Sequence, residues 1–594
     1  MENVIIVASA FMVCLDANNS PIRQTQIGKI RGKVTSRLPG TEVEEFLGVP
    51  FVAPPVAQLR FKRPTNPTPW NDVKETTSLP PACPQLNWYY LHTHVPTFTK
   101  ASEDCLYMNI FVPRVKNKPL PVLLYVHGGS NRVGMGAMLD ADILAAYGQI
   151  IVINFNYRLG VLGFYADRCE GIEGNLGLLD QVEAMKWVQH NIKFFDGDPS
   201  RVTIHGHSAG AGDVGLHLIS DLTQGLFKNA VVHSGSPLAY WAVSECVPTS
   251  RKKTTPSNCK EGSSHIVHTY TYTELMQKSA MDEDFLSTDG EKSPYELVGF
   301  RPVIDNYFLT ASPQQLLKCK KVHADSVLIV MAKDEGFPHY DENYYIHLER
   351  DDKIFRKDFL QAFLRLFTED VQEKFIIEVQ DMYETWKKSN VSRFPHHVQM
   401  GSDVIFYVPM IKLADMIAKW TDDVYLLSFD YVSQNLTGPK WQGVPHGWDL
   451  FYVFGIPLVG HPLHTYTQRD IDVAKTTMSL FSNFVKYGYL SVDGDDRLRN
   501  YNITDNYFNT LDFHRGKPTI TSDLHFRKER VDFWYKYLFP SDNFNCSYGY
   551  TLRHNFTCSN GSTLRYSITF SNIINMYGLR ILLFCIFFNS FSTS

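Results

Sequence analysis

A serine enclosed by two glycines is the first feature of this sequence that could carry out chemistry. Ser208 lies in Gly206-His207-Ser208-Ala209-Gly210, which matches the Gly-x-Ser-x-Gly pattern of a nucleophile elbow. The strand-like run Arg201-Val-Thr-Ile204 precedes this motif, and a segment that can continue as a helix, 209–219, follows it. A strand, a sharp turn and a helix in this order expose a serine hydroxyl above the edge of a sheet. The pattern predicts a serine nucleophile, and the alternative is a glycine-rich turn with an idle serine.

A serine hydroxyl becomes nucleophilic only when a base removes its proton and an acid orients that base. In chains with such an elbow the acid and then the histidine follow the serine. Glu335 comes directly after one apolar strand-like run, and His446 follows a later one in Gly443-Val-Pro-His446-Gly447. The neighbouring Asp334 is an equally placed acid, and the residues alone do not choose between the two. We therefore predict a site built from Ser208, His446 and one of these two carboxylates.

The negatively charged oxygen of an acyl-transfer intermediate needs backbone N–H donors beside the nucleophile. The apolar run that ends at Val126 leads into His127-Gly128-Gly129-Ser130, where glycine lets the backbone approach a substrate closely. Ala209, directly after the nucleophile, is the expected third donor. The alternative for the glycine pair is an ordinary turn that ends a strand.

Alternating strands and helices must bring these residues together. Continuous apolar, β-branched runs are typical of strands that are covered on both faces, and they occur at 121–126, 149–153, 201–204, 230–232, 326–330 and 424–428. Helical periodicity appears at 177–195, 472–486 and 527–538. This alternation predicts an α/β fold with a mostly parallel, twisted sheet flanked by helices. The polar stretch 247–293 reads as an insertion that shapes the rim of the site.

Composition places the chain among globular proteins. Of its 594 residues 44% are hydrophobic, and the formal net charge is −5 without a basic stripe, which excludes nucleic acid as an expected partner. The apolar run Val4–Leu15, followed by the small Ala17, predicts a signal peptide over 1–17, and the alternative is a buried N-terminal strand. Seven glycosylation sequons favour a secreted or extracellular glycoprotein: Asn18, Asn390, Asn435, Asn502, Asn545, Asn555 and Asn560.

The ten cysteines also suit an oxidising compartment. Three close pairs predict local disulfide loops: Cys83/Cys105, Cys246/Cys259 and Cys546/Cys558. Cys169 and Cys319 have no such neighbour, and we expect them to be free and buried. The spacings do not suggest a metal site.

The end of the chain changes in composition after Pro540. The segment 541–594 is a polar, sequon-rich tail that ends in a short apolar run at 581–588. That run is too short for a confident membrane span. It allows two interpretations, a glycolipid-anchor signal that would attach the protein to a membrane surface, or a locally packed or disordered tail.

Motifs along most of the chain resemble the type-B carboxylesterase and cholinesterase family, which has the α/β-hydrolase fold with long loop insertions around a gorge. The similar stretches, in family order, are Phe46-Leu-Gly-Val-Pro50, Ser102-Glu-Asp-Cys-Leu-Tyr-Met-Asn109, Asn156-Tyr-Arg-Leu-Gly-Val-Leu-Gly-Phe164 and Gly174-Asn-Leu-Gly-Leu-Leu-Asp-Gln181. We therefore expect a carboxylesterase domain at 22–540. The resemblance implies that the nucleophile, acid and base fall on Ser208, Glu335 and His446, and that the oxyanion donors fall on Gly129, Ser130 and Ala209. It also implies a disulfide between Cys83 and Cys105.

The chain departs from the cholinesterase branch of this family at two places. Cholinesterases carry a glutamate before the nucleophile, where His207 stands here, and a tryptophan that stacks on choline, for which Trp88 is offset. The cation–π recognition of choline is therefore not expected.

Neuroligins, the non-catalytic adhesion branch, are similar in His127-Gly-Gly-Ser130 and Phe454-Gly-Ile-Pro-Leu-Val459, but they typically lose the catalytic serine.

The prediction is a serine carboxylesterase that hydrolyses small-molecule esters without a metal or organic cofactor. The alternative is an adhesion or ligand-binding protein that retains the triad without significant turnover. The sequence makes no prediction of the oligomeric state.

Overall fold

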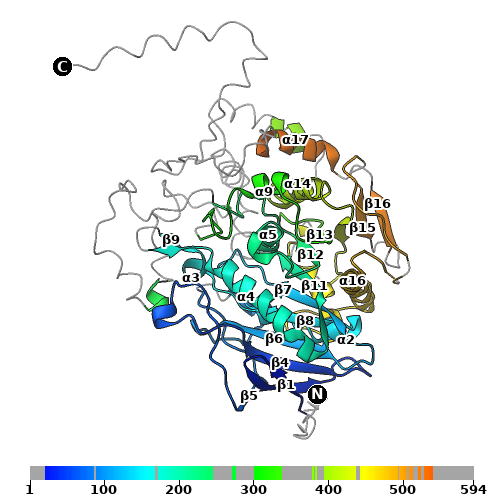
Figure 1. Cartoon of the computed structure of the whole chain (residues 1–594). Coiled ribbons are helices and arrows are strands. Elements are labelled where there is room, and N and C mark those ends of the chain that lie inside the picture. Colours follow the sequence, from blue (N-terminus) through cyan, green and yellow to red (C-terminus); the bar gives the residue numbers. More distant parts are fainter. Residues whose placement is uncertain are drawn as a thin grey trace, which may run out of the picture.

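The computed structural model describes residues 20–539 except for 86–88, 168–170, 245–270, 276–299, 337–377, 380, 384–393, 436–441, 493, 495, 505–506, 513–518 and 524–526. Its centre is one eleven-stranded sheet (Figure 1). The strands of this sheet are β3 (Lys33–Thr35), β4 (Val43–Pro50), β6 (Tyr107–Pro113), β7 (Leu120–Val126), β8 (Ile151–Phe155), β11 (Gly197–His207), β12 (Asn229–His233), β13 (Ser326–Ala332), β14 (Val424–Asp430), β15 (Phe508–Asp512) and β16 (Thr519–Asp523).

The strand order is β16-β15-β14-β13-β12-β11-β7-β8-β6-β4-β3. All neighbours from β8 to β15 pair in parallel, and the pairs at both edges are antiparallel. The predicted α/β fold with a mostly parallel sheet is therefore confirmed. Two small sheets lie outside it and contain β1 (Ile22–Thr25), β2 (Gly28–Arg31) and β5 (Val73–Glu75), and β9 (Ala166–Asp167) with β10 (Ile172–Glu173).

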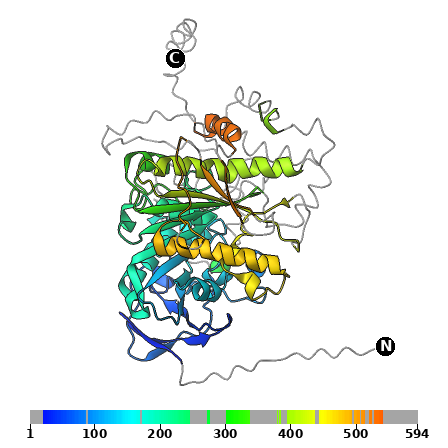
Figure 2. The ribbon, with the colours of Figure 1, turned by 90° about the vertical axis from the view of Figure 1, so that its right-hand side faces the viewer.

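Helices cover both faces of the sheet. The described α-helices are α1 (Tyr89–His92), α2 (Asp142–Gly148), α3 (Gly160–Phe164), α4 (Leu176–Asn191), α5 (Ala209–His217), α9 (Pro313–Cys319), α13 (Phe394–Gly401), α14 (Val408–Ile417), α15 (Leu450–Val453), α16 (Gln468–Tyr487) and α17 (Lys528–Leu538). Shorter turns are the 3₁₀-helices η2 (Ala57–Leu59), η3 (Gly136–Met138), η4 (Ile192–Phe195), η5 (Asp221–Thr223) and η9 (Ile456–Leu458), and the π-helix η7 (Ser402–Tyr407). Figure 2 shows α14 and α16 on opposite sides of the sheet.

The two covered faces explain the apolar runs in the central strands. Successive side chains of a strand point to opposite faces, so a strand covered on both sides needs apolar residues at every position. In β7, Val122 and Leu124 join the core cluster that contains α4, α5 and α14, whereas Leu123 and Tyr125 join the cluster that contains α2 and α16.

The predicted helices are present, with shifted ends. The helix expected over 177–195 is α4, which ends at Asn191 and continues as η4 to Phe195. The helix expected from residue 472 starts at Gln468 because Thr467 caps it: the Thr467 side chain accepts from Asp470 N–H, and the Asp470 carboxylate accepts from Thr467 N–H at 2.7 Å. The apolar periodicity indicates only the part of this helix that has a buried apolar face, so it did not predict the polar first turn.

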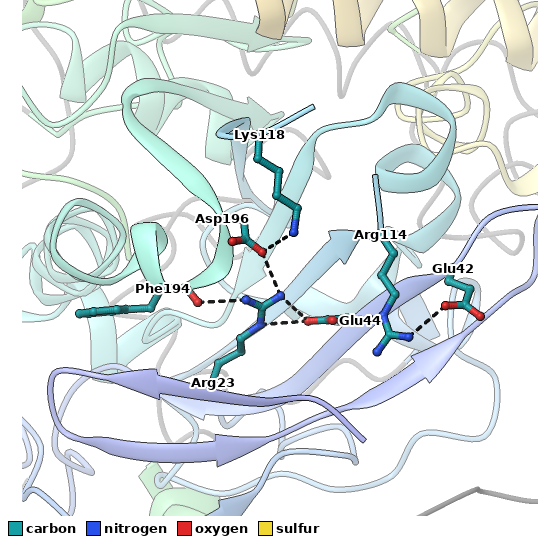
Figure 3. A network of polar contacts seen from close by, with 7 residues as sticks. All are labelled: Arg23, Glu42, Glu44, Arg114, Lys118, Phe194 and Asp196. Carbon is teal, nitrogen blue, oxygen red and sulfur yellow. Dashed lines mark hydrogen bonds and ion pairs between the residues drawn. The ribbon is translucent and has the colours of Figure 1, made fainter. Parts of the chain in front are cut away.

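A network of ion pairs fastens the N-terminal hairpin to the main sheet (Figure 3). The Arg23 guanidinium of β1 lies 2.8 Å from the Glu44 carboxylate of β4 and 3.0 Å from the Asp196 carboxylate. Lys118 donates to Asp196 at 2.6 Å, and Arg114 donates to Glu44 at 3.1 Å. The Arg23 and Glu44 side chains are only 21% and 9% exposed, so solvent screens this pair less than a fully exposed one.

Cysteine pairing is partly as expected. Cys83 and Cys105 form a disulfide with a Cα–Cα distance of 5.0 Å, which confirms that prediction. The prediction that Cys319 is a free, buried thiol is wrong, because Cys319 is half-buried and disulfide-bonded. The sequence missed this bond because a long-range cysteine pair leaves no close spacing to recognise. The other described cysteines are already paired with each other, so the partner of Cys319 lies outside the described residues.

Several expectations fall outside the described part of the chain. These are the signal peptide at 1–17, the tail at 541–594, the pairs Cys246/Cys259 and Cys546/Cys558, Cys169, and the polar insertion at 247–293 except for 271–275. Of the seven sequons, Asn435 and Asn502 are described, and both are exposed. No helix within the described ranges combines the length and apolar character needed to cross a membrane.

Candidate active site

The predicted site residues follow neighbouring parallel strands at one edge of the sheet. Ser130 follows β7, Ser208 follows β11, Glu335 follows β13 and His446 follows β14. Because parallel strands end in the same direction, their carboxyl ends meet along this edge, which is where open α/β sheets hold their sites.

Ser208 occupies the strained turn that a nucleophile elbow requires. Its backbone has φ 58° and ψ −123°, a region that residues with a side chain rarely adopt. The Ser208 N–H donates to the His233 carbonyl at 2.9 Å, which ties the turn to the end of β12. A Cβ atom at Gly206 would lie 2.0 Å from the Gly210 carbonyl oxygen, because the two ends of the motif approach each other closely. The turn therefore requires a glycine at position 206.

Of the two candidate acids, Glu335 is the one whose carboxylate contacts His446. His446 Nδ1 lies 2.6 Å from Glu335 Oε2, and both side chains are at least 95% buried. Glu335 Oε1 accepts a hydrogen bond from Ala332 N–H at 2.7 Å and another from the Ser234 hydroxyl. The carboxylate is thus fully occupied, with one oxygen held by the end of β13 and the other turned to the imidazole.

Asp334 has a different partner. Its Oδ2 accepts from the Val444 N–H at 2.9 Å, and its own N–H donates to the Val444 carbonyl at 3.0 Å. Asp334 therefore fastens the loop that carries His446 and does not orient the imidazole. Ser234, which follows β12 with φ 55°, was missed by sequence reasoning because a single serine after a strand carries no distinctive signal.

Two of the three predicted oxyanion donors lie in a left-handed turn after β7. Gly129 has φ 109° and Ser130 has φ 56°. A Cβ atom at Gly129 would lie 2.1 Å from the Val133 carbonyl oxygen, so only glycine fits there. Within the described part of the chain, the N–H groups of Gly129, Ser130 and Ala209 donate to no carbonyl or side chain. Ala209 also begins α5, whose N-terminal dipole favours negative charge.

The contact between nucleophile and base is not formed in this structure. The Ser208 hydroxyl makes no hydrogen bond to any described residue. Such contacts are often long in a free enzyme and shorten when substrate binds. The Glu335–His446 half of the predicted triad is therefore assembled, and the Ser208 half is not.

His207 is a neighbour of the site whose role the sequence did not predict. Its ring centre lies 4.7 Å from that of His446, while the Phe406 ring stacks on His446 at 4.6 Å. Neither ring nitrogen of His207 has a hydrogen-bond partner among the described residues. Burial, with the nearby imidazoles His446 and His233, lowers the pKa of His207 well below its usual value. His207 is thus a neutral group beside Ser208.

A second imidazole–carboxylate pair lies behind His207. His233 Nε2 is 2.6 Å from Asp449 Oδ2, and the His205 ring nitrogen lies 3.2 Å from His233 Nδ1. His207 of β11 is paired with His233 of β12, whereas His205 is paired with Val231. Histidines near the ends of two strands were the signal available in the sequence. In the described residues no group of three or more His, Cys, Asp or Glu side chains is arranged to hold a metal ion.

Comparison with known proteins identifies the family. The model of the carboxylesterase family matches residues 19–534. The chain belongs to the carboxylesterase family. Neuroligin-3 of Mus musculus is 30% identical over 588 residues, covering 88% of this chain and 69% of the neuroligin. Neuroligin-2 of Mus musculus is 31% identical, covering 79% of this chain and 60% of the neuroligin. The acetylcholinesterase of Bungarus fasciatus is 31% identical over 488 residues, covering 78% of each chain.

The resemblance inferred from the motifs, including the segments similar to neuroligins, is thereby confirmed. Relatives that include neuroligins and an acetylcholinesterase favour an extracellular or cell-surface location. Membership of this family agrees with an esterase and also with an adhesion protein, so activity has to be argued from the site.

Proposed function

We propose that the protein is a carboxylic ester hydrolase that acts through Ser208, His446 and Glu335. The observation that carries the proposal is the 2.6 Å hydrogen bond between His446 Nδ1 and the buried Glu335 carboxylate, beside a serine in elbow conformation. With Nδ1 donating to Glu335, the lone pair of Nε2 is available to accept the serine proton.

The reaction proceeds in two steps, acylation of Ser208 and hydrolysis of the acyl-enzyme. The Ser208 oxygen attacks the ester carbonyl while His446 takes the hydroxyl proton, and the oxyanion is bound by the N–H groups of Gly129, Ser130 and Ala209. His446 then gives its proton to the leaving alkoxide, which departs as the alcohol and leaves an acyl-enzyme. In the second step His446 removes a proton from water, the resulting hydroxide attacks the acyl carbon, and the carboxylic acid leaves as Ser208 regains its proton.

The groups around His446 favour a neutral ester. His207 carries no charge beside the nucleophile, so no carboxylate at this position attracts a cationic alcohol. Phe406 stacks on His446, and the Trp241 ring lies 6.1 Å from Phe406, with its indole N–H held by the Ile405 carbonyl at 3.1 Å. These rings supply an apolar wall for an uncharged acyl or alcohol chain.

The alternative function is a neuroligin-like adhesion or ligand-binding protein without significant turnover. The neuroligin matches and the missing Ser208–His446 hydrogen bond favour it. The retained triad side chains favour the esterase, because a protein under no demand for hydrolysis has no reason to keep a strained serine and a buried ion-pair partner for its base.

A fluorophosphonate probe distinguishes these functions, because it reacts with activated serines. The wild-type protein is expected to become labelled and to hydrolyse short nitrophenyl esters, and Ser208→Ala is expected to lose both signals. Ser36→Ala, which changes an exposed serine near β3, is the matched control and should behave like the wild type. Well-folded wild-type protein that neither reacts with the probe nor cleaves the esters would contradict the proposal and favour the adhesion function.

A further inference from the structure

The oxyanion turn is held in a conformation that its own residues disfavour. Gly129, Ser130 and Asn131 all have positive φ, at 109°, 56° and 56°. A residue with a side chain loses about 1 kcal/mol in the left-handed region, although asparagine tolerates it better than most. Contacts from outside the turn must therefore stabilise this geometry.

Asn131 receives those contacts. Its carbonyl accepts from Gly160 N–H at 2.7 Å, and its Oδ1 lies 3.0 Å from the Tyr157 hydroxyl, which is also 2.8 Å from the His127 carbonyl. Its Nδ2 donates to Asp213 Oδ1 at 3.1 Å. Asn131 is 4% exposed, so these bonds compete with almost no water.

Asp213, which accepts the hydrogen bond from Asn131, belongs to α5, the helix that begins directly after Ser208. Its side chain is buried, and its Oδ2 accepts from Gln181 Nε2 of α4 at 2.7 Å. The Gln181 Oε1 in turn lies 2.7 Å from His217 Nε2. One carboxylate thus joins the helix behind the nucleophile, the neighbouring helix α4 and the oxyanion turn.

No cation balances this carboxylate among its direct contacts. Its two partners, Asn131 and Gln181, are neutral amides, and burial lowers the pKa of His217 to about 3, so that imidazole is neutral as well. Burial raises the pKa of Asp213 to about 7, against the opposing effect of the two amide donors. Asp213 therefore gains or loses its proton near neutral pH.

We propose that Asp213 is a positioning residue that holds the oxyanion turn through Asn131. The proposal rests on the esterase function proposed above. Both Asp213 oxygens accept amide hydrogens in the structure, which suits the ionised carboxylate. A protonated Asp213 must donate one hydrogen, so one of the two amides has to turn away. Loss of the Asn131 contact loosens Ser130 and Gly129, whose N–H groups then meet the developing oxyanion with poorer alignment.

The effect is expected in the transition state. Oxyanion donors act mainly after the carbonyl oxygen has become negative, so misalignment lowers kcat and leaves KM nearly unchanged. Removing one such donor entirely costs about a hundredfold to a thousandfold in rate, so a loosened turn is expected to cost roughly tenfold to a hundredfold. Ionised Asp213 is the form that holds the turn, so activity should fall as the pH drops through about 7.

The test compares ester hydrolysis by the wild type with that of Asp213→Asn and Asn131→Gly over pH 5 to 9. Both variants are expected to lose kcat by roughly tenfold to a hundredfold with KM within about threefold. In the wild type log kcat/KM should fall by about one to two additional units as the pH drops through about 7, and the acid limb of Asp213→Asn should lack this component. Asn131→Gly accommodates the positive φ without the amide, so it separates the lost contact from backbone strain.

Asp221→Asn is the matched control, since Asp221 is an exposed residue of η5 bound to Lys320, and it should keep wild-type kinetics. An active wild type with unchanged kcat and unchanged acid limb in both variants would overturn the positioning role and leave the esterase function standing. A folded wild type without hydrolysis would overturn both. If Asp213→Asn fails to fold, an unchanged kcat in Asn131→Gly is sufficient to overturn the proposal.

Discussion

The bond between Glu335 and His446 makes Glu335→Gln the sharpest test of the proposed mechanism. Glutamine has nearly the same shape as glutamate, so it changes hydrogen-bond character and little else. Glu335 Oε1 already accepts from Ala332 N–H and from the Ser234 hydroxyl, so the amide oxygen must remain on that side. The amide nitrogen then faces His446 Nδ1 as a donor. Two donors cannot share a hydrogen bond, and the imidazole has to move its proton to Nε2.

An imidazole that carries its proton on Nε2 has no lone pair there, so it cannot accept the Ser208 proton. Replacement of the orienting carboxylate by an amide in a serine triad lowers the rate by about 10⁴-fold through this change of tautomer, which is roughly 5 kcal/mol of transition-state stabilisation at 1.36 kcal/mol per tenfold. KM should change little, because the substrate does not touch Glu335. The assay is steady-state hydrolysis of nitrophenyl acetate and butyrate, with circular dichroism and urea unfolding to show that the variant is folded.

Asp334→Asn is the control for the neighbouring acid. An asparagine at this position can still accept from the Val444 N–H, so the loop that carries His446 keeps its anchor. We expect a loss of less than about tenfold. A folded Glu335→Gln protein with activity within tenfold of the wild type, or an Asp334→Asn protein with the larger loss, would refute the assignment of the acid.

Three further measurements test the stability of the scaffold. Replacing Cys83 and Cys105 by alanine opens a loop with a sequence separation of 22 residues and should lower the free energy of unfolding by about 3 kcal/mol in urea titrations. Arg158→Met leaves the buried Asp180 carboxylate without the guanidinium that now contacts it at 2.7 Å, and should cost about 3–5 kcal/mol; a loss below 1 kcal/mol would show that the pair is dispensable. Asp213 binds its proton more tightly in the folded chain, with a pKa of about 7, than at its usual 3.8, so stability should fall as the pH rises from 4 to 7 by roughly 4 kcal/mol in total. Urea midpoints of Asp213→Asn should lack this component, and an identical pH dependence in both proteins would contradict it.

The sheet could be predicted from the sequence because its central strands are buried on both faces. In β13, Ser326–Ala332, an unbroken apolar run follows the first residue, and β12 and β14 contain shorter apolar runs of the same kind. The edge strands carry mixed polar and apolar residues: β3 (Lys33–Thr35) and β16 (Thr519–Asp523) were not among the expected runs for that reason. The parallel arrangement then placed Ser208, Glu335 and His446 at one edge without any knowledge of contacts.

The residues alone did not choose between Asp334 and Glu335, and only the family resemblance implied Glu335. Adjacent residues leave a strand in different directions, and which carboxylate turns inward depends on the backbone after β13 and on the donors that receive it. Those donors come from Ala332, three residues away, and from Ser234, which follows the neighbouring strand β12. No local pattern contains this information.

The Asn131–Asp213 contact could not be predicted from the sequence either, because it also depends on residues that are distant in the chain. The two residues lie 82 positions apart, and each is unremarkable in its own segment: an asparagine in a turn, and a polar residue in the first turns of a helix. Only the packing of α5 against the turn after β7 brings them together. Long-range polar contacts of this kind are specified by tertiary geometry, whereas hydrophobic periodicity specifies elements.

The residues around the triad therefore decide whether retained triad side chains amount to an enzyme. Ser208 can be predicted from a motif and Glu335 from the family resemblance, but the rate of acyl transfer depends on the alignment of donors and on the charge next to the base. In this chain those properties are set by neutral His207 against His446 and by the buried link from Asp213 to Asn131. A carboxylate buried against two amides weakens the folded state near neutral pH. The positioning role proposed for Asp213 would account for such a group behind the oxyanion turn.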